Sequence, residues 1–142
     1  MRKITLSLFL LCFSTTVLLA QDVTGKWKTI DDNTGEARSI VDIYKQDGKV
    51  YGKVVEILNK EKKDALCTDC SGDDEGKPIQ GLVIIKGLEK DGDEYTDGKI
   101  LDPSTGKLYK CYIALEEPNK LKVRGYVGFS LLGRTQYWHR VE

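Results

Sequence analysis

Turn signals recur along this chain roughly every eight to twelve residues, and short segments rich in β-branched and aromatic residues lie between them. The turns include the Asp-Gly pairs at 47–48 and 91–92, which tolerate the backbone geometry of tight hairpins. No segment shows a sustained helical period. The spacing therefore predicts eight strands, over residues 24–30, 39–44, 49–58, 81–88, 94–101, 107–115, 120–127 and 134–141.

All connections but one are of hairpin length, so each strand should neighbour the next one in the sequence. Eight strands in such a meander close most naturally into a single antiparallel up-and-down β-barrel, which leaves no exposed sheet edge. The exception is residues 59–78, NKEKKDALCTDCSGDDEGKP. We expect this charged, cysteine-bearing segment to form a long loop over one mouth of the barrel, with a disordered segment as the alternative.

The first twenty residues have the pattern of a secretory signal peptide. A positive start at residues 1–3 precedes an apolar run over residues 4–19, and Ala20 stands before the first polar residues. A membrane helix would need a longer run with fewer hydroxyl side chains. The sequence therefore predicts cleavage after Ala20, export to the periplasm or the cell exterior, and one β-barrel domain over residues 21–142.

Charge narrows the classes of partner. Residues 21–142 carry 20 basic and 22 acidic side chains, a net charge of −2. Residues 21–98 hold 12 basic and 18 acidic side chains, whereas residues 99–142 hold 8 and 4. This balance argues against nucleic-acid binding. No second apolar span of membrane length follows, so we expect a soluble protein that does not span a membrane.

Several longer stretches resemble a known family. They are GKWKT (25–29), KVYGKVVEI (49–57), GKPIQGLVIIKGL (76–88), DGKILDPSTGKLYKC (97–111) and LKVRGYVGFSLLGRTQYWHRV (121–141). Together they are similar to the bacterial domain-of-unknown-function family 2147, whose members are small exported proteins. The resemblance runs from about Val23 to Val141. It implies a lipocalin-like barrel in the bacterial envelope, and it implies no reaction.

A more distant likeness concerns the two ends of the domain. Lipocalins and fatty-acid-binding proteins begin with Gly-x-Trp on the first strand, and an arginine from the last strand lies across the indole ring and closes the barrel. The matching residues here are Gly25 and Trp27, with Arg134 or Arg140 as the arginine. We assign barrel closure to Gly25, Trp27 and Arg140.

The remaining arginines of the last two strands allow two interpretations. Alternation places Arg134, Gln136, Trp138 and Arg140 on one face of the last strand. If Leu121 and Val123 face the core, Arg124 points outward; if the interior is polar, arginines converge inside and bind a carboxylate or phosphate. An inward arginine needs a ligand or a protein carboxylate. The candidate carboxylates are Asp42 and Glu56 in mid-strand, and Asp102 or another carboxylate in a turn. The candidate ligand-binding set is Arg124, Tyr126, Arg134, Gln136 and Trp138.

Three cysteines remain after residue 20, and an oxidising compartment favours a disulfide between two of them. We expect Cys67 to pair with Cys70, and a bridge from the loop to Cys111 is the alternative. The acidic residues that follow Cys70 disfavour a redox-active thiol. A zinc site would need a fourth ligand, and nothing places His139 near the loop, so we expect no metal.

No catalytic motif is present, since the chain has neither a nucleophile elbow nor a phosphate-binding loop. We therefore expect a protein that is not an enzyme, uses no cofactor and binds a small hydrophobic or amphipathic anionic ligand in its barrel. The alternative is a structural or interaction module of the cell envelope with a filled core. The sequence identifies no protein partner.

Overall fold

The computed structural model describes residues 22–141, and the segment predicted to be a signal peptide lies outside them. Its eight strands confirm the predicted β-meander, with bounds that differ from the expected ones by a few residues. They are β1 (Gly25–Ile30), β2 (Ala37–Gln46), β3 (Lys49–Ile57), β4 (Val83–Asp91), β5 (Glu94–Asp102), β6 (Lys107–Glu117), β7 (Lys120–Tyr126) and β8 (Gly133–Arg140).

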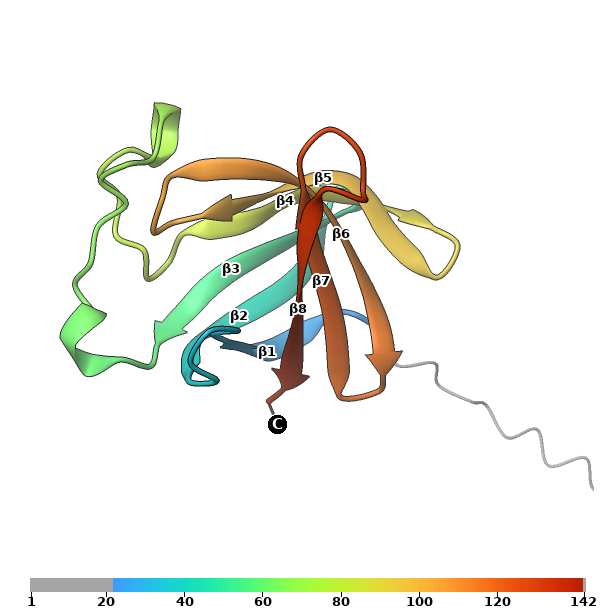
Figure 1. The fold of residues 1–142 in the computed structure, drawn as a ribbon, viewed down its shortest axis with the longest axis horizontal. Coiled ribbons are helices and arrows are strands. Elements are labelled where there is room, and N and C mark those ends of the chain that lie inside the picture. The colour runs from blue at the N-terminus through green and yellow to red at the C-terminus, as the bar shows by residue number, and fades with distance from the viewer. Residues whose placement is uncertain (1–21, 142) are drawn as a thin grey trace, which may run out of the picture.

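The strands form a closed antiparallel barrel in sequence order, and β8 pairs with β1 to close it (Figure 1). Successive connections of an up-and-down barrel lie at alternate ends. The β1–β2, β3–β4, β5–β6 and β7–β8 connections therefore share one end, which we call the mouth. The other three turns share the opposite end, the base, with the start of β1. Among the described residues, no helix is long and apolar enough to cross a membrane.

Side-chain alternation separates the inner face of each strand from its outer face. On β7, Leu121 and Val123 are buried, whereas Lys122 and Arg124 between and beside them are only partly buried and lie on the outer face. Apolar side chains from all eight strands point into the interior in this way, each stabilising the fold by roughly 1.5–3 kcal/mol when fully buried. The most completely buried of them include Trp27, Val41, Ile43, Val50, Ile85, Leu88, Ile113, Leu121 and Trp138.

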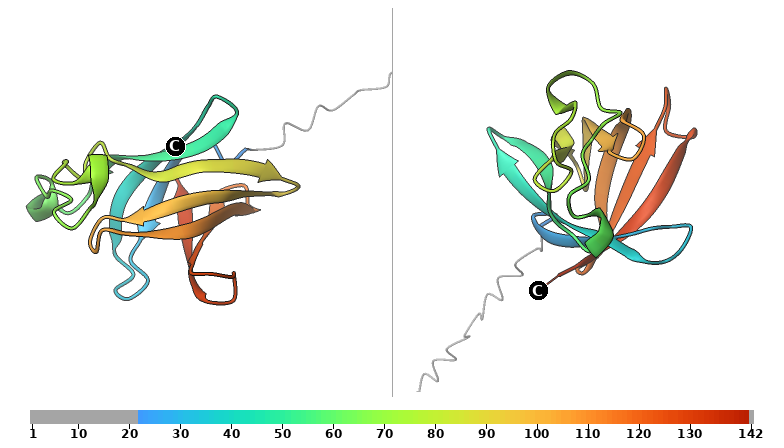
Figure 2. Two further views of the ribbon diagram at one scale, coloured as in Figure 1. Left: turned by 90° about the horizontal axis from the view of Figure 1, so that it is seen from above. Right: turned by 90° about the vertical axis from the view of Figure 1, so that its left-hand side faces the viewer.

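The long β3–β4 connection carries two short 3-10 helices, η1 (Lys60–Lys62) and η2 (Gly72–Asp74). It projects beyond one end of the barrel in Figure 1 and in the left view of Figure 2. A disulfide joins Cys67 to Cys70, and both are buried. The loop packs closely on the β5–β6 turn, where a Cβ atom at Gly106 would lie 1.8 Å from the Asp69 carbonyl oxygen. An ion pair between Asp74 and Lys86 also ties it to β4.

Candidate functional site

The barrel is incompletely closed along the seam between its first and last strands. β1 and β8 pair through only two residue pairs, Trp27 with Arg140 and Lys28 with His139. By contrast, β7 and β8 pair through seven. The register of β1 against β2 shifts between Thr29 and Ile30, and the chain then leaves the sheet. β1 therefore ends while β8 still continues toward the mouth, and the seam opens at that end.

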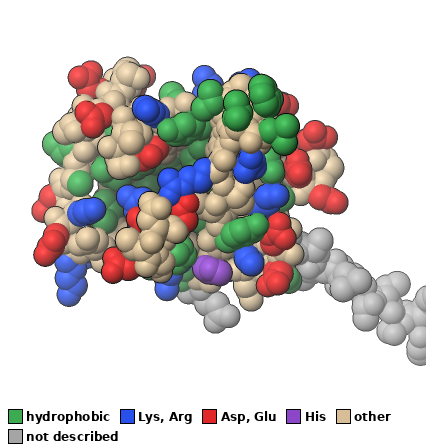
Figure 3. Space-filling view, in the orientation of Figure 1, with side chains coloured by type: hydrophobic (Ala, Val, Ile, Leu, Met, Phe, Trp, Pro, Cys, Tyr) green, Lys and Arg blue, Asp and Glu red, His purple; other side chains and the backbone are tan. Residues whose placement is uncertain are grey.

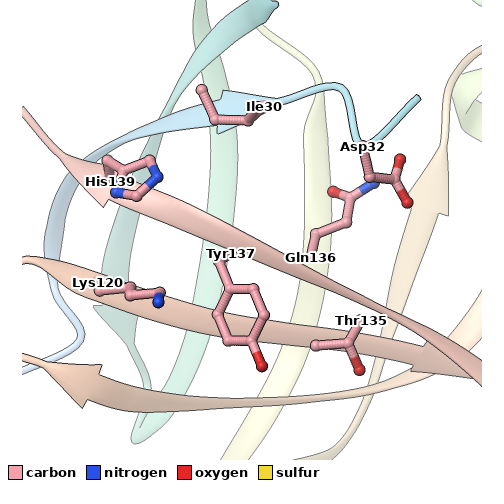
Figure 4. A pocket seen from close by; sticks show the side chains of 7 residues that line it. All are labelled: Ile30, Asp32, Lys120, Thr135, Gln136, Tyr137 and His139. Atoms are coloured by element: carbon pink, nitrogen blue, oxygen red, sulfur yellow. The ribbon is translucent and has the colours of Figure 1, made fainter. Parts of the chain in front are cut away.

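A pocket of about 340 Å³ lies at this opening, and we call it the seam groove (Figure 4). Thr135, Tyr137 and His139 line it from the outer face of β8. Gln136 belongs to the inner face, because it pairs with the buried Val123. The groove thus runs over the outside of the seam between β1 and β8, and it reaches the inner face of the barrel at the side chain of Gln136. Its lining residues are Ile30, Asp32, Lys120, Thr135, Gln136, Tyr137 and His139.

Gln136 is held by the barrel core but keeps hydrogen-bonding capacity. Its Oε1 accepts a hydrogen bond of 3.2 Å from the indole nitrogen of the buried Trp138. The two amide hydrogens of Gln136 remain as donors, since an amide side chain offers both. This arrangement fixes the orientation of the amide, and it presents donors where the groove meets the interior.

The net charge of the groove is positive, because Arg134 neutralises Asp32 and the charge of Lys120 remains. Asp32 is the only acidic lining residue, and the Arg134 guanidinium binds its carboxylate through two nitrogens. The hydrogen bond from Arg134 holds the pKa of Asp32 below its usual range, so this pair is charged at neutral pH and neutral overall. The Lys120 ammonium adds a positive charge 4.7 Å from the centre of the Tyr137 ring. Among residues 22–141, no carboxylate pairs with it.

Apolar surface accompanies this charge. The side chain of Ile30 is half-buried at the end of β1, and Tyr137 is 42% exposed. The Thr135 hydroxyl accepts a hydrogen bond of 2.8 Å from Arg124 Nη1, which leaves its own hydrogen free to donate. An isoleucine, a tyrosine ring, an ammonium group and several donors around one groove suit a small amphipathic anion.

The five residues predicted to bind a ligand do not converge. Arg124 and Tyr126 lie on the outer face of β7, because Leu121 and Val123 occupy the inner face. Arg124 donates to the Ser130 carbonyl and to Thr135 instead. The other three lie on the inner-face register of β8: Arg134 is bound by Asp32, Gln136 lines the seam groove, and Trp138 is buried.

The carboxylate that binds Arg134 comes from the β1–β2 connection. It is a turn carboxylate, as one of the expectations had it, but it is Asp32 and not Asp42, Glu56 or Asp102. Sequence reasoning also missed six of the seven groove residues, namely Ile30, Asp32, Lys120, Thr135, Tyr137 and His139. The alternation along β8 groups Tyr137 with His139. The sequence also predicts that the first strand ends at Ile30, but no local signal indicates that this end lies beside Tyr137 and His139.

The residues assigned to barrel closure meet at the base. The guanidinium of Arg140 lies 4.3 Å from the centre of the Trp27 ring. It also donates to the carbonyl oxygens of Asp22, Thr24 and Pro118 at 2.8, 2.9 and 3.0 Å. At Gly25, whose φ is +124°, a Cβ atom would lie 2.8 Å from Arg140 Nη1. The glycine therefore makes room for the arginine that covers the indole.

The cysteines offer no reactive centre among the described residues. Cys67 and Cys70 form the disulfide expected from their spacing. Cys111 is a free thiol on β6, completely buried in the barrel, and burial raises its pKa to about 12. Within residues 22–141 no cluster of three or more histidine, cysteine, aspartate or glutamate side chains is placed to hold a metal ion.

Comparison with known proteins supports the architecture. The model of a family described as "Uncharacterized protein conserved in bacteria (DUF2147)" matches residues 25–140. The fold is also similar to a solved structure, protein HP1028 from the human pathogen Helicobacter pylori, described as belonging to the lipocalin family. The TM-score is 0.76 at 19% sequence identity, over 87% of this chain and 85% of that one. No curated protein matches the sequence significantly.

Proposed function

The chain belongs to the DUF2147 family, and on that premise we propose that it is an exported, non-enzymatic protein that binds a small amphipathic anion. The fold supports binding, because lipocalin-like barrels of eight strands are wide enough to hold one small ligand. The proposed site is the seam groove together with the inner-face amide of Gln136. This differs from a site formed by inward arginines, since Arg124 lies outside and Arg134 already has a carboxylate partner.

The observation that carries the proposal is the combination of charge and apolar surface in the seam groove. A carboxylate or sulfonate would be attracted to the Lys120 ammonium and could accept hydrogen bonds from Thr135 and His139. The apolar part of the ligand would cover Ile30 and the Tyr137 ring, which are otherwise open to water. The ionised Asp32 does not repel such a ligand strongly, because Arg134 neutralises it.

Export is part of the proposal and has two supports. The first is the charged and then apolar pattern of residues 1–20, which is typical of a signal peptide. The second is the disulfide between Cys67 and Cys70, a bond that persists in oxidising compartments and is rare in the cytosol.

An interaction module with a filled barrel is the second candidate, and the packing at the base favours it. Trp27 and Trp138 are both almost completely buried there, so the protein's own side chains occupy that half of the interior. In such a protein the seam groove would be a surface feature without a ligand, and the barrel would serve as a rigid support for its loops.

An NMR titration that follows individual backbone amides distinguishes the ligand-binding protein from the interaction module. The ligand is decanoate, a simple amphipathic carboxylate. The seam-groove proposal predicts saturable shifts at the amides of Ile30 and of residues 135–139. Saturable shifts confined to interior residues such as Val41 and Ile43 would place the ligand inside the barrel and overturn the groove. The absence of saturable shifts up to the micellar limit would favour the filled-core module.

Two matched variants test the chemistry of the groove. Lys120→Gln removes the unpaired positive charge, and it should weaken decanoate binding about ten-fold, the effect of losing a charge-assisted hydrogen bond. Lys53→Gln removes an exposed lysine from β3 and should leave the affinity unchanged. Equal affinities for the two variants would contradict the role of Lys120. Native mass spectrometry of the protein from bacterial envelopes would then give the mass of any natural ligand.

A further inference from the structure

The β7–β8 connection, residues 127–132, exposes an unusual amount of apolar surface. Seven large hydrophobic side chains are exposed among the described residues, and four of them lie in this six-residue segment. Leu131 is 83% exposed, and the others are about equally open to water at 60–61%. We call this segment the apolar loop; its exposed side chains are Val127, Phe129, Leu131 and Leu132.

The backbone of the apolar loop is held from within the protein. Arg124 donates to the Ser130 carbonyl oxygen through Nε at 2.9 Å and Nη2 at 2.6 Å, and the Lys110 ammonium donates to the Gly128 carbonyl oxygen at 3.0 Å. Backbone amides bind two further loop carbonyls, those of Phe129 and Leu132. Carbonyls that already have partners cost less to bring into a medium of low polarity. The loop can therefore leave water without breaking these bonds.

Positive charge lies directly behind the apolar tip. Lys110 and Arg124, on the outer faces of β6 and β7, reach the loop itself. Lys122 continues this basic strip away from the mouth, and Tyr126 lies at the end of β7 next to the loop. The acidic residues of β6 and β7 are Glu116 and Glu117, at the base end of the two strands.

Figure 3 shows the same order on the surface, with hydrophobic side chains gathered at the top over the β7–β8 connection and Lys or Arg side chains below them. The cysteine-bearing β3–β4 connection projects in a different direction in Figures 1 and 2. Its acidic residues, including Asp73, Asp74 and Glu75, therefore do not share the tip with the apolar loop.

We propose that the apolar loop docks the protein on an anionic lipid surface, with the leucines and Phe129 among the acyl chains and Lys110 and Arg124 at the phosphates. Apolar side chains at the tip are followed by Tyr126 and then by lysine and arginine side chains. This order matches the acyl, interfacial and phosphate layers of a membrane. Each lysine or arginine side chain near an anionic membrane surface strengthens the attachment of the protein several-fold. A projecting loop of apolar side chains next to Lys110 and Arg124 suits a fluid bilayer, whereas protein interfaces centre on well-packed pockets.

A fluorophore at the tip tests this directly. Ser130→Cys places a thiol in the apolar loop for labelling with an environment-sensitive dye, and the buried Cys111 thiol and the disulfide should stay unlabelled. The full chain is expressed, recovered after export and checked by mass for a single label. With vesicles of equal parts phosphatidylglycerol and phosphatidylcholine, we expect the emission of the dye to shift to the blue. We also expect quenchers embedded in the bilayer to reduce this emission. A label at Asn119→Cys, in the exposed β6–β7 turn at the base, should show neither.

Substitutions in the protein and changes of the lipid or salt separate the contribution of the apolar side chains to vesicle binding from that of the basic side chains. Leu131→Ser in the labelled protein should weaken vesicle binding at least ten-fold, because the transfer of this 83% exposed leucine side chain into the bilayer is lost. Leu66→Ser is the matched control, since it removes an exposed leucine from the cysteine-bearing loop and should have no effect. Vesicles of phosphatidylcholine alone, or high salt with the anionic vesicles, should also weaken binding, because both remove the attraction to Lys110 and Arg124.

Three results would overturn the proposal: an unchanged Ser130→Cys spectrum with anionic vesicles, equal binding by Leu131→Ser and Leu66→Ser, or a blue shift that depends on protein concentration without any lipid. The last would assign the apolar loop to contact with a second copy of the chain, and sedimentation would then show a dimer that Leu131→Ser dissociates. None of these outcomes depends on the seam groove, whose decanoate titration is read from other residues.

Discussion

Replacing Arg140 with methionine should loosen the base of the barrel. The change keeps a long apolar side chain over Trp27 but removes three hydrogen bonds to main-chain carbonyls. Two of these bonds are partly buried and should each contribute about 1 kcal/mol, and the exposed one to Pro118 less. The cation–π contact adds roughly 0.5–1 kcal/mol. We therefore expect Arg140→Met to lower the free energy of unfolding by about 3 kcal/mol.

Urea denaturation, monitored by tryptophan fluorescence, measures this loss in the free energy of unfolding, because Trp27 lies at the base of the barrel beside Arg140. With a denaturant slope near 1.5 kcal/mol/M, the midpoint should fall by about 2 M. Arg140→Lys should lose about half as much, since a single ammonium group cannot donate in three fixed directions. The control is Arg38→Met, which removes a surface arginine 3.9 Å from Asp31 and should cost less than about 0.5 kcal/mol. Equal midpoints for Arg140→Met and Arg38→Met would refute the role given to Arg140.

Three further predictions concern the loop, the mouth and the core. Changing both Cys67 and Cys70 to serine should lower the free energy of unfolding by about 2 kcal/mol, the chain-entropy value for so short a closed loop, and calorimetry against the oxidised wild type would show it. Because the pKa of Asp32 is depressed by Arg134, its contribution to stability is complete above the unfolded value of 3.8 and is lost as pH falls through the lower folded value. Asp32→Asn should therefore lose less stability than wild type between pH 6 and pH 3 in urea titrations, and parallel curves would exclude the ion pair as a source of acid sensitivity. Finally, the Cys111 thiol, with its pKa raised to about 12 by burial, should resist a disulfide reagent at pH 8 in the folded protein and react promptly in urea; rapid reaction of the native protein would mean that the barrel opens readily.

Local chemistry determined the strand pattern, and the sequence therefore predicted it. The Asp47-Gly48 turn connects β2 to β3 because its backbone conformation is set by the turn residues themselves, with φ values of 52° at Asp47 and 78° at Gly48. In the next hairpin, Asp91 is the last residue of β4, and the turn begins at Gly92, whose φ is 61°. Alternation on β7 separates Leu121 and Val123 from Arg124 for the same local reason. Short connections then leave a sequential meander, whose closure removes the exposed edges.

The partner of Arg134 was decided only by the tertiary structure. Arg134 and Arg140 occupy equivalent faces of one strand, yet one binds Asp32, 102 residues earlier in the sequence, and the other covers Trp27. Their partners come from β1 and the connection after it, so their roles depend on where that strand meets β8. The seam groove has the same origin, because it exists where β1 ends at Ile30 while β8 continues. The register between the first and last strands is the last constraint that barrel closure imposes, and no neighbouring residues in the sequence encode it.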